Sequence, residues 1–382
     1  MRKNVNLNKL RAAACLLVLV YHCWALLGGT PIRIPVLREY VAYGGLIGVT
    51  MFFGLSGYGI YSSLFATEAA GGKISFWTFM GKRIRRVLPH YYLNLLVALL
   101  LTGSAVYVTT AHLGNIISHL FFYHNFNYDW HGAINGVLWT MAVIFQFYLV
   151  AIPLYFFVKK FRHWAVVTAV GFTVAAQYVT LNYLWVLDDA VLGSFAFAIP
   201  ARQVWTALDN FVIGMYVAHL FNTKKQPAVH WPYAVGCVLC AGLICGLCQL
   251  ANTYGVWGRG LWNCCFFSIL AVLVGLLFFC ASNAKQQESS IAARVLLWVS
   301  KYEYGIYLWH LLIMNNLLAH SGLLQALLTP GRKILAYIML IGCSIVTGHI
   351  MTVLVNGLKL PAFPRKKIKS DTDSSTRCAR SG

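Results

Sequence analysis

Charged side chains are scarce in this sequence, and acidic side chains are the scarcest. Only 10% of the 382 residues are Asp, Glu, Lys or Arg, and only 10 are acidic. In contrast, 59% are hydrophobic, and the mean hydropathy is +0.67. So little charge and so much apolar surface indicate a polytopic membrane protein rather than a water-soluble one.

Apolar runs of about 20 residues, the length that crosses a bilayer as a helix, recur along the chain. We therefore predict an all-α integral-membrane domain over residues 1–357 with about ten transmembrane helices. The predicted spans are 8–28, 41–64, 90–108, 136–158, 164–183, 203–221, 231–251, 261–281, 297–318 and 334–357. A shorter apolar run, 113–122, is expected to be re-entrant or interfacial. Residues 358–382 are basic and then rich in Ser, Thr and Asp, which predicts a disordered cytoplasmic tail.

Lysine and arginine are distributed unevenly between alternate loops, although the formal net charge of the whole chain is +20. If the N-terminus is cytoplasmic, the outside segments hold only Arg33, Arg38, Arg202, Arg259, Arg332 and Lys333. This asymmetry follows the positive-inside rule and predicts that both termini are cytoplasmic. It also makes anionic membrane lipid, and not nucleic acid, the expected partner of the excess charge.

No spacing of Cys and His in the sequence resembles a zinc site. The 11 cysteines mostly fall inside the predicted spans, where a buried thiol behaves as a small apolar residue. We therefore predict no metal site and no disulfide framework.

Two ionisable residues, Arg11 and His22, interrupt the first predicted span, and no charge lies between them. Eleven positions of an α-helix return to within roughly 20° of the same face and cover about 16 Å of its axis. Ionisable groups in lipid are costly, so they are functional candidates by default. In the structural alternative, Arg11 reaches the headgroups and His22 is a hydrogen-bonded residue of the bundle.

A basic cluster, Lys82 to Arg86, stands at the cytoplasmic end of the third span and is followed by Pro89. Such a cluster binds lipid headgroups in many membrane proteins. Alternatively, it binds a phosphate-rich cytosolic ligand, to which arginine forks are suited. Pro89 would then start a helix and fix the direction of the cluster.

Other polar and small residues mark three further spans. The second span carries Gly54 and Gly57 within Phe52–Tyr58, and such small residues predict close helix packing. Gln146 lies about 10 Å deeper than Trp139, an expected interface anchor, and needs a polar partner there. His310 lies within the ninth span and, taken alone, would more often be structural than catalytic.

Taken in order, these motifs resemble the membrane-bound acyltransferase-3 family. The matching positions are Arg11 with His22, residues 52–58, Arg86 with Pro89 and Tyr91, residues 135–139 with 146–149, Arg202 with Phe211 and Gly214, and residues 304–310. One departure is that Ile144 and Phe145 stand where many relatives have an acidic pair. No catalytic carboxylate is therefore assigned there.

The resemblance implies a multi-pass O-acyltransferase of the bacterial cytoplasmic membrane, which transfers groups other than aminoacyl groups. It implies a cytosolic acyl-CoA, usually acetyl-CoA, as donor substrate and not as a permanently bound cofactor. The implied acceptor is a hydroxyl of a sugar in a surface polysaccharide or a related glycan, or of a lipid-linked sugar. Because no soluble domain follows the membrane domain, we expect a stand-alone enzyme or one that works with a separate glycan-biosynthesis protein.

The same resemblance assigns roles to individual residues. Arg11, Arg83 and Arg86 are expected to bind the CoA phosphates, with Tyr91 at the same site. His22 is expected to be the general base on the acceptor hydroxyl. The distance of about 16 Å between Arg11 and His22 matches the reach of a pantetheine arm.

Two roles stay open within the resemblance. The oxyanion of the thioester needs a donor, which His310, Gln146 or Tyr91 could supply; His310 joins His22 and Arg11 in the predicted catalytic set. Asp209, inside the sixth span, either orients a histidine or pairs with a cation of the bundle.

A rival function from another class is a transporter or flippase of a lipid-linked sugar or small solute. Intramembrane His, Arg and Asp residues also occur along transport pathways. The sequence shows no pair of matching broken helices that would indicate two repeats, which favours the enzyme.

Overall fold

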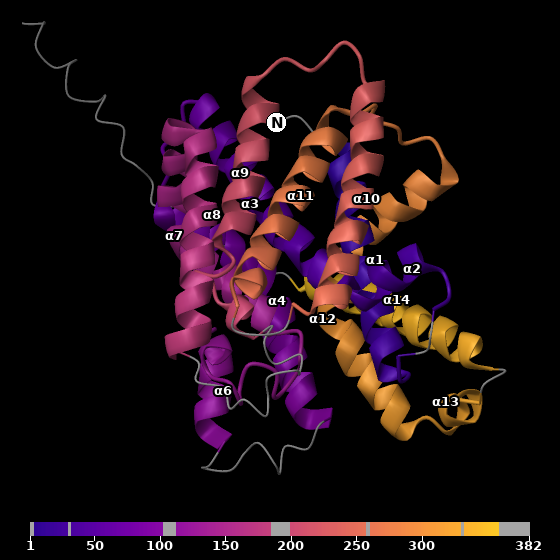
Figure 1. Cartoon of the computed structure of the whole chain (residues 1–382). Helices are drawn as coiled ribbons and strands as arrows, with labels where there is room; N and C mark the ends of the chain where they lie inside the picture. The colour runs from indigo at the N-terminus through magenta and orange to yellow at the C-terminus, as the bar shows by residue number, and fades with distance from the viewer. Residues whose placement is uncertain are drawn as a thin grey trace, which may run out of the picture.

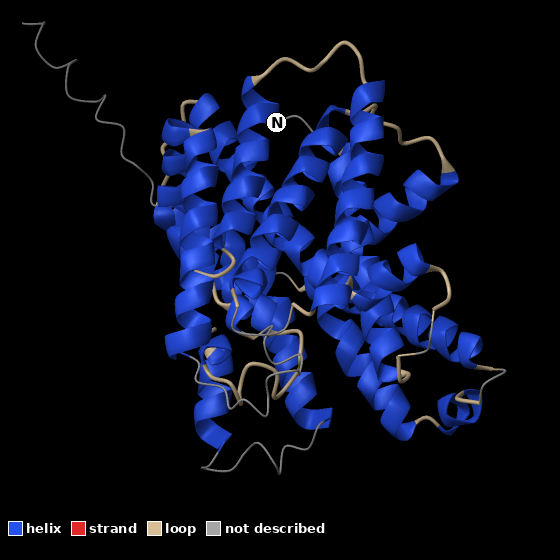
Figure 2. Cartoon of the chain, viewed as in Figure 1, coloured by secondary structure: helices blue, strands red, loops and turns tan. Residues whose placement is uncertain are grey.

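The computed structural model describes residues 4–29, 32–101, 112–184, 199–256, 260–329 and 332–358. The predicted tail beyond residue 358 and the end of the third predicted span lie outside these residues. The described part of the chain is helical and contains no strand (Figures 1 and 2), which confirms the predicted all-α class.

Long helices occupy the ten predicted spans in order, and most of their ends lie within a few residues of the predicted ones. They are α1 (Val5–Leu26), α3 (Gly44–Ala69), α4 (Phe76–Leu101), α7 (Trp139–Phe161), α8 (His163–Val179) with the π-helical η3 (Thr180–Leu184), α9 (Leu208–Thr223), α10 (Trp231–Tyr254), α11 (Leu261–Asn283), α12 (Ile291–His320) and α14 (Lys333–Gly357). Short helices connect them: α2 (Pro35–Ala42), α6 (Leu113–Leu120), η2 (His124–Phe126), η6 (Pro200–Arg202) and α13 (Gly322–Leu327). The short apolar run after the third span is therefore the helix α6.

Among the described residues, 7 helices are long and apolar enough to cross a membrane: α1, α3, α7, α8 with η3, α10, α11 and α14. The other three predicted spans are α4 and α12, which carry several charged residues, and α9, which has only 16 residues. The chain is thus an all-α protein with several membrane-spanning helices. The total of ten spans and the cytoplasmic termini stay predictions.

The helix α4 corrects one expectation about the basic cluster. Pro89 was predicted to start a helix, but it lies inside α4, which begins at Phe76. Pro89 has no N–H to donate to the carbonyl of Arg85, yet the helix continues because buried residues on both sides of the proline pack into the bundle. Arg83 and Arg86 therefore belong to one continuous helix and not to a loop that precedes it.

The bundle is organised around α3, which packs along both α1 and α9, while α1 also packs along α12 (Figure 1). Glycines make these contacts close. A methyl group at Gly57 would overlap the carbonyl oxygen of Phe211, and one at Gly214 would overlap that of Gly54. The close packing predicted from the small residues is therefore present between α3 and α9.

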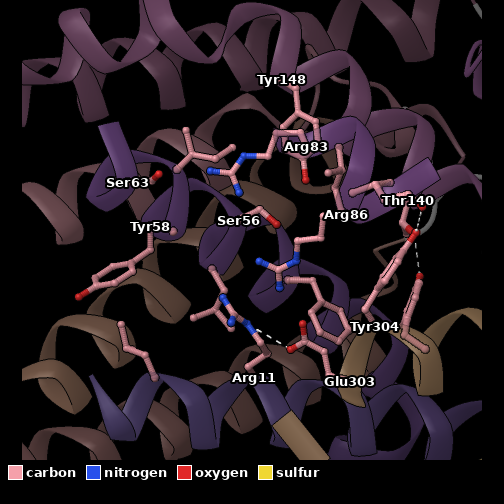
Figure 3. A pocket seen from close by; sticks show the side chains of 18 of the residues that line it. Arg11, Ser56, Tyr58, Ser63, Arg83, Arg86, Thr140, Tyr148, Glu303 and Tyr304 are labelled. Carbon is pink, nitrogen blue, oxygen red and sulfur yellow. Dashed lines mark hydrogen bonds and ion pairs between the residues drawn. The ribbon is translucent and has the colours of Figure 1, made fainter. Parts of the chain in front are cut away.

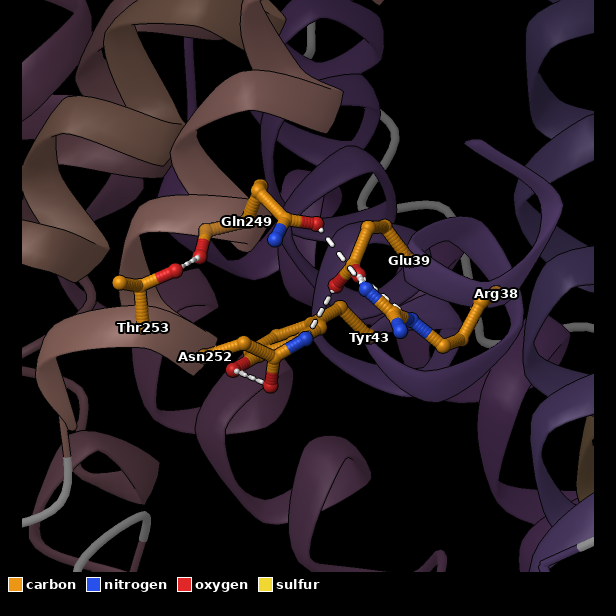
Figure 4. A network of polar contacts seen from close by, with 6 residues as sticks. All are labelled: Arg38, Glu39, Tyr43, Gln249, Asn252 and Thr253. Atoms are coloured by element: carbon orange, nitrogen blue, oxygen red, sulfur yellow. Dashed lines mark hydrogen bonds and ion pairs between the residues drawn. The ribbon is translucent and has the colours of Figure 1, made fainter. Parts of the chain in front are cut away.

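A buried carboxylate holds the short helix α2 against α10 (Figure 4). Glu39 is only 1% exposed and accepts hydrogen bonds from Nε and Nη2 of Arg38, at 2.9 and 2.7 Å, on the same oxygen. Its other oxygen accepts from the amide of Asn252, whose own oxygen accepts from the Tyr43 hydroxyl at 3.0 Å. Both carboxylate oxygens are therefore satisfied, as a buried charge requires.

The close approach of α3 and α9 predicts a difference between two neighbouring glycines. Gly57→Ala should destabilise the protein by about 1–3 kcal/mol, because the methyl group has no room beside a backbone carbonyl. Gly59→Ala is the matched control, since no atom lies within 4 Å of a methyl group there. Thermal unfolding in detergent measures both variants, and equal midpoints would contradict the described packing.

The network around Glu39 predicts a coupling between two substitutions. Glu39→Gln should cost about 1–3 kcal/mol, because the guanidinium of Arg38 loses its charged partner. The double variant with Arg38→Gln should lose less than the sum of the two single variants. Unfolding midpoints of the four proteins give the coupling energy, and strict additivity would show that the ion pair contributes nothing.

Candidate active site

A cavity of about 440 Å³ lies between α1, α3, α4, α7 and α12, and we call it the arginine cavity. Arg11, Arg83 and Arg86 are directed into it from α1 and α4 (Figure 3). Glu303 lies beside Arg11, with 3.2 Å between the carboxylate Oε2 and the guanidinium Nε. Three guanidinium groups thus face one carboxylate among the described lining residues, so the cavity attracts anions.

Packing around α4 sets the direction of these arginines. Arg83 and Arg86 are three positions apart and lie on neighbouring parts of one helix face. The guanidinium of Arg83 lies 5.2 Å from the ring centroid of Phe79 and 5.9 Å from that of Tyr148. The Tyr304 hydroxyl donates to the backbone carbonyl of Val87 at 3.0 Å and fastens α12 to α4 at this cavity.

A second cavity, of about 110 Å³, contains His22, and we call it the histidine cavity. Its polar lining includes Thr50 from α3, Arg202 from η6 and Asn210 from α9. Trp139, at the start of α7, supplies an aromatic wall. Arg11 and His22 therefore lie on one helix, as predicted, but they line two different cavities.

The two cavities adjoin at one side chain, because Tyr307 lines both of them. The Thr140 hydroxyl donates to the carbonyl of Val137 at 2.9 Å, so its oxygen accepts from the Tyr307 hydroxyl, also at 2.9 Å. The ring of Phe52 meets that of Tyr307 edge to face, with 5.1 Å between centroids. Tyr307 is thus held in one position between the cavities.

His22 and His310, which are 288 positions apart, meet in the structure. Nδ1 of His310 lies 2.6 Å from the carbonyl oxygen of Tyr307, so it carries the proton and Nε2 is an acceptor. That Nε2 lies 3.1 Å from Nδ1 of His22, which also lies 3.0 Å from the carbonyl oxygen of Val18. Nδ1 of His22 is therefore the donor to both, and its Nε2 keeps a free lone pair, as a general base requires.

Two other predicted residues do not line either cavity. The Tyr91 hydroxyl donates to the backbone carbonyl of His119 at 2.8 Å. The amide of Gln146 donates to the carbonyl of Phe122 and to Asn125, each at 2.8 Å, which supplies the polar partners that this residue was expected to need. The role of Tyr91 as a CoA ligand stays a prediction. The role of Tyr91 or Gln146 as an oxyanion donor also stays a prediction, and the geometry strengthens neither role.

Asp209, buried in the first turn of α9, orients an amide. Its Oδ1 accepts from the backbone N–H of Asn210 at 2.7 Å and from the side-chain amide of Asn210 at 2.9 Å. Its own backbone N–H donates to the Thr173 hydroxyl at 3.1 Å. No hydrogen bond or ion pair of the described residues joins Asp209 to a histidine or a cation, the two predicted partners.

Sequence reasoning missed Glu303, Tyr307 and Asn210. Glu303 had a usable signal, because an acidic residue within an apolar span is itself a functional candidate, and Arg11 needs a counter-ion. Tyr307 lies in the matching block 304–310 but received no role, and Asn210 had no signal of its own, since only packing shows that the two residues line a cavity.

The described residues contain no group of three or more His, Cys, Asp or Glu that could hold a metal ion. His131, in the connection between α6 and α7, has a pKa that the positive charge of Arg202 affects. Burial, and then the positive charge of Arg202, lower the pKa of His131 to about 4. His131 is therefore neutral at pH 7.

Comparison with known proteins identifies the family of the chain. The family model described as an acyltransferase domain matches residues 4–349. The chain is 26% identical over 80% of its length to the Bacillus subtilis protein YrhL, provisionally named a peptidoglycan O-acetyltransferase, and 25% identical over 80% to the peptidoglycan O-acetyltransferase OatA of Listeria monocytogenes. It is also 26% identical over 82% of its length to nodulation protein 10 of Rhizobium leguminosarum.

The aligned part covers 48% of YrhL and of OatA, so the chain spans about half the length of these relatives, and 84% of nodulation protein 10. No solved structure matches the chain. The family match covers nearly all of the helical bundle and contains every residue of both cavities. The chain therefore belongs to the acyltransferase-domain family, as its ordered motifs predicted.

Proposed function

We propose that this protein is a membrane-embedded O-acetyltransferase, which moves an acetyl group from cytosolic acetyl-CoA to a sugar hydroxyl of a cell-surface glycan. The observation that carries the proposal is the pair of cavities along α1, which adjoin at Tyr307. One is lined by arginines and suits a polyanionic donor, and the other contains a histidine base. The names of YrhL and OatA support the class of acceptor.

The arginine cavity suits the phosphates of CoA. Arg83 and Arg86 offer guanidinium forks, which bind phosphate oxygens in pairs. Arg11 keeps its orientation through Glu303 and adds a third fork. Arg11 and His22 are separated by about 16 Å along α1, a distance that a pantetheine arm can span past Tyr307.

In the proposed reaction, Nε2 of His22 takes the proton of the acceptor hydroxyl while that oxygen attacks the thioester carbonyl carbon. The C–S bond then breaks, the acetyl ester forms, and the CoA sulfur leaves as a thiolate. The imidazolium returns its proton to this sulfur, which restores neutral His22. Throughout, Nε2 of His310 accepts a hydrogen bond from the Nδ1–H group of His22, which keeps its proton, and so holds the His22 ring in its basic tautomer.

Removal of the base is the first test. His22→Ala should lower the transfer of acetyl groups by roughly 10²–10⁴-fold, with normal expression and membrane insertion. The matched control is His320→Ala, which removes an exposed histidine at the end of α12. Purified protein with radiolabelled acetyl-CoA and candidate glycans measures the transfer. Near-normal turnover of the His22 variant would remove it from catalysis, and solute flux without acetyl transfer would favour a transporter.

The donor site is tested by two neighbouring arginines. Arg86→Ala should weaken the binding of CoA by roughly 10-fold or more, because a charged hydrogen bond to phosphate is lost. The maximal rate should change less than KM for acetyl-CoA. Arg85→Ala is the matched control, since Arg85 is exposed and does not line the cavity. Equal effects of the two variants, or an unchanged KM for Arg86→Ala, would contradict the phosphate role.

A further inference from the structure

The histidine cavity contains a cation without a carboxylate partner. The guanidinium of Arg202 lies 4.9 Å from the ring centroid of Trp139, and both residues line the cavity beside His22. No Asp or Glu is among the described residues that line this cavity. The aromatic ring orients the guanidinium but does not neutralise it.

Two other arginines of the described bundle have a carboxylate partner, whereas Arg83 and Arg86 share the arginine cavity with Glu303 and, like Arg202, take part in no described ion pair. Arg11 pairs with Glu303 in the arginine cavity, and Arg38 pairs with Glu39 between α2 and α10. The described ion pairs do not include Arg202. A guanidinium without a countercharge in a largely apolar site is costly, so the site is suited to an anion that a ligand brings.

Asn210 lines the same cavity and has a hydrogen-bond acceptor without a partner. Asn210 is only 8% exposed. Its side-chain nitrogen Nδ2 donates to Asp209, so its oxygen Oδ1 is the end of the amide that does not contact Asp209. Its oxygen Oδ1 is buried and has no hydrogen-bond partner. An unsatisfied buried carbonyl costs free energy, and a sugar hydroxyl that entered the cavity would satisfy it.

We propose that the histidine cavity is the acceptor site and that it selects a sugar with an anionic substituent, a carboxylate or a phosphate. Arg202 binds the anionic group, Asn210 accepts a hydrogen bond from a ring hydroxyl, and the hydroxyl to be acetylated lies at His22. This inference rests on the proposed acetyl transfer, because it identifies the class of substrate at that site.

Binding of three sugars that share one ring tests the selection. The probes are methyl β-glucoside, methyl β-glucuronide and methyl β-glucoside 6-phosphate, titrated by saturation-transfer NMR against the full chain in nanodiscs. The wild-type protein should bind one or both anionic sugars roughly 10- to 100-fold more tightly than the neutral one. Which of the two binds more tightly distinguishes a carboxylate from a phosphate.

Two variants separate the two contacts. Arg202→Gln should remove the preference for the anionic sugars and leave the affinity for methyl β-glucoside unchanged. Asn210→Ala should weaken the binding of all three sugars alike, by roughly 2- to 10-fold. Arg86→Ala is the control for the other cavity and should keep the preference, because Arg86 does not line the histidine cavity.

Several results would overturn the inference. These are equal affinities in the wild-type protein, no binding of any probe, or a preference that survives Arg202→Gln. In the Arg202→Gln variant, loss of acetyl transfer to charged and neutral acceptors alike, with unchanged sugar binding, would instead assign Arg202 to stabilising the oxyanion of the reacting thioester. CoA binding is measured on the same samples: its absence would count against the proposed donor, whereas the sugar titrations test the acceptor site separately.

Discussion

The arrangement depends on one constraint, which is that Arg11 and His22, the two residues of α1 that bring an ionisable group to the cavities, each need a partner inside an apolar bundle. Both partners come from α12: Glu303 pairs with Arg11, and His310 accepts from His22. These two contacts set the position of α12 along α1. They are possible because α1 packs along α12. An unpaired charge or imidazole at either place would be costly.

This constraint explains why the two cavities lie where they do. Close contacts at Gly57 and Gly214 bring α3 against α9, so that Asn210 reaches the cavity that contains His22. On the other side of Tyr307, α4 carries its arginines toward α1 and α12. A donor and an acceptor could therefore occupy separate sites and still meet at one side chain. The small volume of the histidine cavity, about 110 Å³, also favours exclusion of water from the proposed reaction.

Much of the fold could be predicted because the hydrophobic effect acts on local sequence. Apolar runs predicted the helices, and the glycines of the second span predicted a close contact. Residue Pro89 shows the limit, since packing on both sides of it carried α4 through a proline that would otherwise start or end a helix. The short helices α2 and α13 were also missed, because they are too short to show an apolar period.

For the candidate site, the sequence by itself determined which costly residues interrupt apolar helices: Arg11, His22 and His310 were visible because a charge or imidazole contrasts with an apolar run. Only the tertiary structure decided what they face. It placed Arg11 and His22 in different cavities, joined His22 to His310, and left Arg202 in the histidine cavity without a carboxylate. The physical reason is that partners of a buried polar group come from helices distant in the chain, and the packing of those helices has no local signature in the sequence.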